Sequence, residues 1–364
     1  MNFSKATRKY ESWLGEQGRI VRRDLERKHE AMRADPFSFL RATFYRWVQR
    51  WPKMCSELSS APALLAVGDL HVENFGTWRD AEGRLIWGIN DFDEASVMPY
   101  TNDLVRLAVS AHLAIAEAHL TVTGRDACDA ILNGYSEGLD AGGPPFVLSE
   151  QHTWLRDIAL SDLRDPARFW AKMDALETAK GKIPASSRRA LERLLPARDL
   201  PYRLTTRVAG LGSLGHQRFV ALAEWQGGKV AREAKVLVPS ACWWVGLGGA
   251  QRRPFYQEIV DRAVRCRDPF VRLAGRWVVR RLAPDCSRIE LADLPKRRDE
   301  ARLLHAMGWE TANVHLGSPK VIRAVRRNLA RLRPDWLHAA AKAMVEATRE
   351  DFAEWRRAGP DSSR

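Results

Sequence analysis

Two oxygen-bearing side chains lie five positions apart in the stretch GDLHVENFG, residues 68–76, directly after the apolar run Ala63–Val67. Phosphoryl transfer needs a carboxylate beside the acceptor hydroxyl and a nearby oxygen ligand that holds Mg²⁺ on the phosphates. Asp69 is a candidate for the first role and Asn74 for the second. Taken alone the pair is weak evidence, because Asp and Asn are also common in turns and at helix starts.

Three acids follow a second apolar run. Leu85–Ile89 predicts a buried strand, and Asp91, Asp93 and Glu94 come directly after it. Carboxylates this close repel one another unless cations compensate for their charge. Magnesium is a suitable cation because it prefers oxygen ligands. We therefore expect Asp91 to be a metal ligand with Asp93 in support, and a solvated acidic turn is the alternative.

A glycine-rich loop separates two predicted strands much further along the chain. Gly210, Gly212 and Gly215 form a G-x-G-x-x-G pattern between Arg203–Ala209 and Arg218–Trp225. A dinucleotide-binding motif would require a helix directly after the third glycine. A strand on each side instead indicates a hairpin whose backbone N–H groups cover the phosphates of ATP.

The next predicted strand, Lys229–Val238, carries two candidate phosphate contacts. Lys235 is the residue type that pairs with phosphates and with a helix glutamate, and Glu258 is the candidate partner on a predicted helix over 255–264. Arg232 shares a strand face with apolar neighbours. The sequence leaves both basic residues open, and an exposed helix glutamate remains the alternative for Glu258.

Three segments together carry a family resemblance. GDLHVENFG, INDFDEA and NDLVRLAVS resemble the signature of the bacterial domain-of-unknown-function family 2252, and also the pattern of aminoglycoside phosphotransferases. The resemblance implies that Asp69 is the catalytic base and that Asn74 and Asp91 hold the metal. It implies that Asp103 is a structural acid tying the site to the following helix. It also aligns Arg232 with the phosphate contact.

One position departs from the pattern. Val67 stands where kinases and phosphotransferases carry a histidine before the glycine. His71 is a candidate to replace the hydrogen bond of that histidine, and simple packing is the alternative.

The order of the motifs predicts the architecture. In kinases the glycine loop and the lysine precede the catalytic loop, whereas here they follow it by more than a hundred residues. The resemblance therefore implies an α+β, protein-kinase-like, two-lobe fold that is circularly permuted. We expect a helix-rich catalytic segment at 1–200 and a β-rich nucleotide-binding lobe at 201–285. Two C-terminal helices at 286–364 would pack back on the catalytic lobe, the second beginning near Ser318 and Pro319.

Composition limits the class of protein. The 364 residues are 45% hydrophobic and carry a formal charge of +13, which indicates an anionic partner. Five scattered cysteines and a polar start favour a reduced, cytoplasmic protein. No apolar run approaches the ~20 residues of a membrane span, so no membrane partner is expected.

The sequence thus predicts an ATP- and Mg²⁺-dependent phosphotransferase acting on an unknown small molecule or protein. Nucleotidyl transfer from the same ATP site is an alternative. A non-catalytic, pseudokinase-like scaffold that binds nucleotides or nucleic acid is another. The basic run over 320–333 would suit nucleic acid, although a solvated amphipathic face is its default interpretation.

Overall fold

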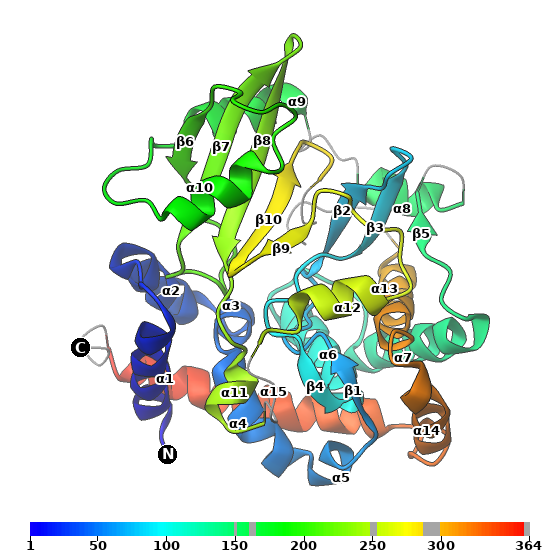
Figure 1. Cartoon of the computed structure of the whole chain (residues 1–364). Helices are drawn as coiled ribbons and strands as arrows, with labels where there is room; N and C mark the ends of the chain where they lie inside the picture. Colours follow the sequence, from blue (N-terminus) through cyan, green and yellow to red (C-terminus); the bar gives the residue numbers. More distant parts are fainter. Residues whose placement is uncertain (149–150, 160–164, 248–252, 287–298, 360–364) are drawn as a thin grey trace.

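A five-stranded antiparallel sheet forms one end of the molecule in the computed structural model (Figure 1). The structure describes residues 1–148, 151–159, 165–247, 253–286 and 299–359. The strand order is β6-β7-β8-β10-β9. The bounds are Arg203–Thr206 for β6, Arg218–Trp225 for β7, Gly228–Val236 for β8, Arg272–Ala274 for β9 and Trp277–Leu282 for β10. The segments predicted as strands at 203–209, 218–225 and 229–238 are thereby confirmed within a few residues.

The hairpin between β7 and β8 turns where the sequence predicts it. Gln226 and Gly227 have φ of 47° and 78°, in the left-handed region that glycine adopts without strain. Trp225 pairs with Gly228 across the turn, and Arg218 pairs with Lys235 at the opposite end of the hairpin. The two strands therefore pair along their full length. The glycine loop joins β6 to β7.

Each face of this sheet is covered by one short helix. On one face, α10 (Ala185–Glu192) packs Leu191 against Phe219 and Trp277. On the other face, α9 (Pro166–Asp174) packs Met173 against Val220. Both helices precede residue 201, so residues that the sequence division assigns to the catalytic segment pack on the sheet.

The remaining helices form the larger body below the sheet (Figure 1). Their bounds are α1 Phe3–Gln17, α2 Arg22–Ala34, α3 Pro36–Ala42, α4 Phe44–Met54, α5 Ser56–Ser59, α6 Thr101–Ala116, α7 Gly124–Ala141, α8 Thr153–Ala159, α11 Ala241–Trp244, α12 Tyr256–Arg262, α13 Glu300–His315, α14 Pro319–Leu329 and α15 Trp336–Arg357. The expectation of two C-terminal helices is wrong, because the described part of this region has three. Pro334 lies between α14 and α15, where its ring prevents one continuous helix.

Close helix packing in the body depends on glycine. A Cβ at Gly134 of α7 would lie 1.9 Å from His305 O, and one at Gly308 of α13 would lie 2.0 Å from Ile131 O. Only hydrogen fits at both positions, so the backbones of α7 and α13 approach each other closely. Many of the largest buried side chains are tryptophans, including Trp51, and each removes a large apolar area from water.

Two small sheets position the acidic segments. In the first, β1 (Ala63–Ala66) pairs with β4 (Ser96–Pro99). In the second, the order is β2-β3-β5, with bounds Phe75–Arg79, Leu85–Ile89 and Phe146–Val147. The catalytic-loop candidate GDLHVENFG therefore connects the end of β1 to the start of β2, and the three acids follow β3.

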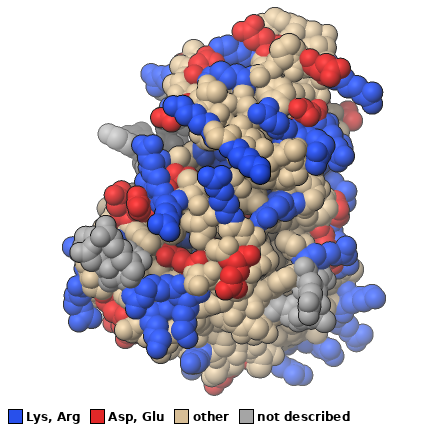
Figure 2. Space-filling view, turned by 60° about the vertical axis from the view of Figure 1, so that its left-hand side comes forward, with Lys and Arg blue, Asp and Glu red and all other residues tan. Residues whose placement is uncertain are grey.

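The charged surface has no single basic stripe on the face seen in Figure 2. Lysine and arginine side chains gather there in several groups, with acidic and uncharged side chains between them. Among the described residues, no helix combines the length and the apolar character needed to cross a membrane. Mixed helix and sheet content fits the α+β class that the sequence predicts.

Candidate functional site

The loop before Asp69 is held by a carboxylate at the start of α6. Asp103 is fully buried, and its two oxygens accept hydrogen bonds from the backbone N–H groups of Val67 at 2.7 Å and Gly68 at 2.9 Å. His315 on α13 also contacts Asp103, with 3.0 Å between Nε2 and Oδ2. The structure thus places Asp103 in the tying position that the resemblance implies, and Gly68 supplies the positive φ of 83° needed there.

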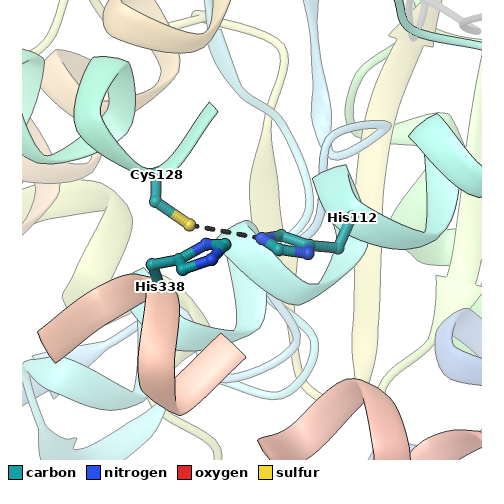
Figure 3. A group of neighbouring side chains, drawn as sticks. All are labelled: His112, Cys128 and His338. Carbon is teal, nitrogen blue, oxygen red and sulfur yellow. Dashed lines mark hydrogen bonds between the residues drawn. The ribbon is translucent and has the colours of Figure 1, made fainter. Parts of the chain in front are cut away.

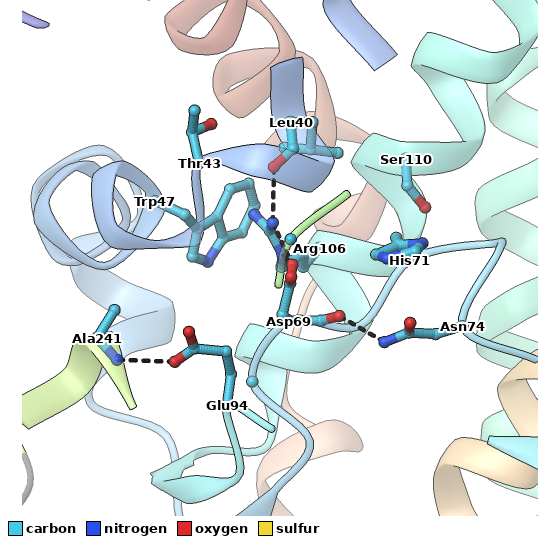
Figure 4. A network of polar contacts seen from close by, with 12 residues as sticks. Leu40, Thr43, Trp47, Asp69, His71, Asn74, Glu94, Arg106, Ser110 and Ala241 are labelled. Atoms are coloured by element: carbon cyan, nitrogen blue, oxygen red, sulfur yellow. Dashed lines mark hydrogen bonds and ion pairs between the residues drawn. The ribbon is translucent and has the colours of Figure 1, made fainter. Parts of the chain in front are cut away.

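Asp69 is bound by an arginine that sequence reasoning did not single out (Figure 4). The Arg106 guanidinium donates to Asp69 Oδ1 through Nε at 2.7 Å and also through Nη2. Nη2 donates to Leu40 O as well, and the guanidinium lies 5.0 Å from the ring of Phe44 and 4.9 Å from that of Trp47. Because Arg106 is fully buried, it fixes Asp69 from behind and leaves Oδ2 for the cavity.

Burial raises the pKa of Asp69, and Arg106 opposes that rise. A carboxylate with a raised pKa accepts a proton more readily than an exposed one does. One feature of the sequence could have pointed to Arg106. It is a cation within the apolar helix pattern of residues 103–116, three residues after Asp103.

Asn74 and His71 shape the loop itself. Asn74 Nδ2 donates to Asp69 O at 2.7 Å, which leaves its Oδ1 as the oxygen that can bind a metal. His71 is buried and its Nδ1 accepts a hydrogen bond from the Glu73 N–H at 3.2 Å. His71 therefore supports the turn between Asp69 and Asn74, and both His71 and Asn74 line the cavity in front of Asp69.

The acids after β3 meet the lysine of β8. Lys235 Nζ lies 3.5 Å from Asp91 Oδ1 and also forms an ion pair with Asp93. Burial and the charge of Asp91 raise the pKa of Asp93 to about 6, although Lys235 lowers it. Asp93 Oδ1 is buried and has no hydrogen-bond partner among the described residues. These oxygens form a donor set that suits a hard divalent cation.

Glu94 is a further carboxyl group in the cavity, and the sequence interpretation gave it no role of its own. Its Oε2 accepts a hydrogen bond from the Ala241 N–H at 2.7 Å (Figure 4). Burial raises the pKa of Glu94 to about 7 despite hydrogen bonds from Ser240 and Ala241. Glu94 lines the same cavity as Asp69.

The glycine loop lies directly over Asp69. A Cβ at Gly212 would stand 3.5 Å from Asp69 Oδ2 and 3.2 Å from Arg41 O. Lys28 on α2 is buried, and its Nζ donates to Gly212 O at 3.1 Å. Gly215 lies elsewhere, against Leu25, and its carbonyl accepts a hydrogen bond from the N–H of Val21. The N-terminal segment therefore holds the loop against the catalytic-loop candidate.

Two hollows meet at Asp91 and Gly210, which line both of them. The first holds about 60 Å³ and is lined by Asp69 and Asn74 beneath Gly212. The second holds about 390 Å³ and lies between the sheet and the β2–β3 hairpin. The first is the smaller of the two, and Gly212 lies directly over Asp69 within it.

The two basic residues of β8 lie in different surroundings. Lys235 lines the larger hollow, whereas Arg232 lies on the opposite face of the strand, donates to Leu194 O and stacks on Phe270. The prediction for Glu258 is wrong, because its carboxylate pairs with Arg262 one turn further along α12 at 2.9 Å. The ion pairs of Lys235 are with the two aspartates.

A histidine–cysteine cluster lies outside this site, among α6, α7 and α15 (Figure 3). The ligand atoms of His112, Cys128 and His338 lie within 4.8 Å of one another. Tetrahedral zinc would hold them about 3.6 Å apart. His112 and Cys128 are already hydrogen-bonded at 3.4 Å, and burial raises the pKa of the Cys128 thiol to about 12. A hydrogen-bonded pair packed against His338 accounts for the cluster, and we assign no metal to it.

A glutamate on α13 supports the strand that leads to Asp91. Glu310 is buried beside Gly88, accepts a hydrogen bond from the Ile89 N–H at 3.2 Å and another from Asn313 Nδ2 at 2.9 Å. Burial raises the pKa of Glu310 to about 7, from 4.5 in the unfolded chain. Its protonated form is thus favoured in the folded state, and that contribution to stability is lost as pH rises from about 4.5 through 7.

We therefore expect Glu310→Gln to become more stable relative to the wild type as pH rises. The advantage should grow by up to about 3 kcal/mol between pH 5 and pH 8, since one pKa unit corresponds to about 1.4 kcal/mol. Urea unfolding of both proteins at the two pH values measures this difference, and other titrating groups cancel in the comparison. An advantage that is equal at the two pH values would contradict the prediction.

A family model matches the part of the chain that carries the acidic residues of the site. Residues 19–169 match the family model described as "Uncharacterized protein conserved in bacteria (DUF2252)". The match includes Asp69, Asn74, Asp91 and Arg106, and it ends before the glycine loop and Lys235. No curated protein and no solved structure matches the chain. The resemblance to family 2252 is thus supported over this stretch.

Proposed function

We propose that the chain is a protein-kinase-like phosphotransferase of circularly permuted order that uses ATP and Mg²⁺. One observation carries the proposal: the glycine loop lies over the cavity that contains Asp69, Asn74 and Asp91. These motifs are more than a hundred residues apart in sequence. Coverage of the phosphates by a glycine loop, opposite a carboxylate and metal ligands, is the arrangement that phosphoryl transfer needs.

The residues have distinct roles in this proposal. Asp91 and Asn74 hold Mg²⁺ through oxygen, with Asp93 beside them, and the ion neutralises charge on the phosphates. Lys235 contacts the phosphates once its aspartate partners turn to the metal. Asp69, oriented by Arg106, accepts the proton of the acceptor hydroxyl. A bond forms between the acceptor oxygen and the γ-phosphorus, and the bond from that phosphorus to the ADP oxygen breaks.

Nucleotide binding gives the first test. Mg-ATP should raise the melting temperature of the wild-type protein, because a ligand that binds only the folded state stabilises it. Asp91→Asn should weaken Mg-ATP binding by roughly tenfold or more, since it removes a charged metal ligand but keeps the shape. Asp157→Asn, an exposed change on α8, is the control. Unchanged Mg-ATP affinity in Asp91→Asn would refute the metal assignment.

Turnover separates the alternatives that share the site. Transfer of label from γ-labelled ATP to an acceptor identifies phosphoryl transfer. Transfer from α-labelled ATP, with release of pyrophosphate, identifies nucleotidyl transfer. Binding of Mg-ATP without transfer of either label to a range of acceptors would favour the non-catalytic scaffold.

A further inference from the structure

The larger hollow, which we call the cationic cleft, is lined by six basic side chains. They come from the sheet and from the segment after α12: Arg207, Arg218, Lys235, Arg265, Arg280 and Arg281. The acids that line it are Asp91, which belongs to the metal-site candidate, and Asp268. An excess of cations around a concave space attracts an anionic ligand.

One buried acid neutralises part of this charge. Glu233 is fully buried and forms ion pairs with Arg207, Arg218 and Arg280 at 2.7 to 2.9 Å. Three arginines around one carboxylate leave two positive charges uncompensated. Of the residues of the five-stranded sheet that line the cleft, Leu282 is apolar and four are basic, namely Arg218, Lys235, Arg280 and Arg281. This part of the sheet therefore offers little of the apolar surface that binding of an adenine ring needs.

Of the aromatic rings that line the cleft, Trp78, Phe92 and Tyr256 are buried, and Phe169 packs against Trp170. The Arg265 guanidinium lies 4.3 Å from the ring of Trp78 and 5.2 Å from that of Phe92. Rings stacked on arginine present less free surface to a nucleotide base. The cleft thus combines strong positive charge with little exposed aromatic surface.

Two of the arginines retain donors that are not used. Arg265 Nη1 and Arg281 Nε are buried and have no hydrogen-bond partner among the described residues. An unsatisfied buried donor is unfavourable, more so when it is charged, so an acceptor that reaches it is bound more tightly. Phosphate oxygens are suitable acceptors for guanidinium groups.

Strand register gives the distance between Lys235 and Arg280, the two basic residues that we call the basic row. Arg280 pairs with Glu233 across β10 and β8, two residues along β8 from Lys235. That separation is about 7 Å along an antiparallel strand. A triphosphate is about 10 Å long, on the order of three extended residues. The row therefore spans most of a triphosphate chain that begins at Lys235 and Asp91.

From these observations we infer that the cationic cleft recognises its donor by the polyphosphate chain and discriminates only weakly between bases. The inference rests on the proposed function, because Asp91 and Lys235 form the reactive end of the chain. Nucleoside triphosphates and inorganic tripolyphosphate share the recognised group. AMP and adenosine lack it.

Competition binding in the presence of Mg²⁺ tests the inference on the full chain. ATP and GTP should bind within about threefold of each other, and tripolyphosphate within about tenfold of ATP, while adenosine should not compete at millimolar concentration. Competition by adenosine but not by tripolyphosphate would overturn the inference. In that result, Mg-ATP binding that depends on Asp91 would leave the proposed function standing. Failure of both ATP and tripolyphosphate to bind would overturn both.

Variants of two arginines that line the cationic cleft give an independent readout. Arg281→Gln should weaken tripolyphosphate and ATP by the same factor, about tenfold for one lost charge-assisted contact. Arg281 is not among the ion-pair partners that the structure shows for Glu233, so this substitution removes none of them. Arg280→Gln should do the same, with thermal unfolding used to confirm that the variant is folded. The control is Arg272→Gln, an exposed change on β9. Unchanged tripolyphosphate affinity in Arg281→Gln and in folded Arg280→Gln overturns the inference.

Discussion

Asp69→Asn should lower the rate of transfer from ATP by about 10²–10⁴-fold while Mg-ATP affinity stays within about threefold. In the proposed function Asp69 acts on the acceptor, because its Oδ2 faces the cavity, and the substitution leaves the metal candidates Asp91 and Asn74 intact. Single-turnover rates measure the first effect, and a titration with Mg-ATP measures the second.

Loss of the Asp69 charge also affects folding, because Arg106 is fully buried and Asp69 is its ion-pair partner. Removal of one partner from a buried pair costs about 3–5 kcal/mol. Asp69→Glu is therefore the matched variant, since it keeps a charge for Arg106 but moves the carboxylate by one methylene. We expect it to unfold near the wild-type temperature and still to lose transfer. If Asp69→Asn stays folded and retains a tenth of the wild-type rate, Asp69 is not the base.

Local sequence patterns predicted the parts of the fold that depend on local chemistry. The apolar runs at 63–67 and 85–89 contain β1 and β3. The alternation over 218–236 gave two strands and their turn. Each of these elements is specified by its own residues, so a single sequence is sufficient to find it.

The residues that sequence reasoning missed all act across long distances in the chain. Arg106 joins Leu40 to Asp69, which are 29 residues apart, and Lys28 reaches Gly212 over 184 residues. A lysine within a strongly charged helix is typical of a solvated face, so nothing local marks Lys28 as buried. The same limit explains Glu258, because helical spacing gave its position but not its partner.

The family resemblance implied roles that the residue patterns left open. The structure shows where the residues concerned lie. It aligned Arg232 with the phosphate contact, yet Arg232 and Lys235 differ by three positions and so point to opposite faces of β8. Lys235 is the residue that lines the cationic cleft. Strand alternation could have shown that Arg232 and Lys235 cannot both point into one cleft. It could not show which face of the strand the cleft covers.

Glu233→Gln should lower the free energy of unfolding by about 3–5 kcal/mol, the cost of breaking a buried ion pair. Burial opposes ionisation, yet the three arginines hold the pKa of Glu233 well below its usual range. The carboxylate is therefore charged in the folded protein, and glutamine leaves the buried Arg218 without its counterion. Glu224→Gln, an exposed change on β7 of the same sheet, should cost less than about 0.5 kcal/mol. Urea unfolding of the two variants measures the contrast.

The same substitution separates a structural cluster from a ligand site. If Arg207, Arg218 and Arg280 serve only to neutralise Glu233, Glu233→Gln loses stability and binds tripolyphosphate no better than the wild type does. If the cationic cleft binds phosphate, loss of the carboxylate frees three guanidinium groups for the ligand. Tripolyphosphate affinity should then rise by about tenfold, and saturating tripolyphosphate should recover part of the lost stability, because a ligand of the folded state stabilises it by mass action. A folded Glu233→Gln variant with weaker tripolyphosphate binding would show that Glu233 orients the arginines for the ligand and does not compete with it.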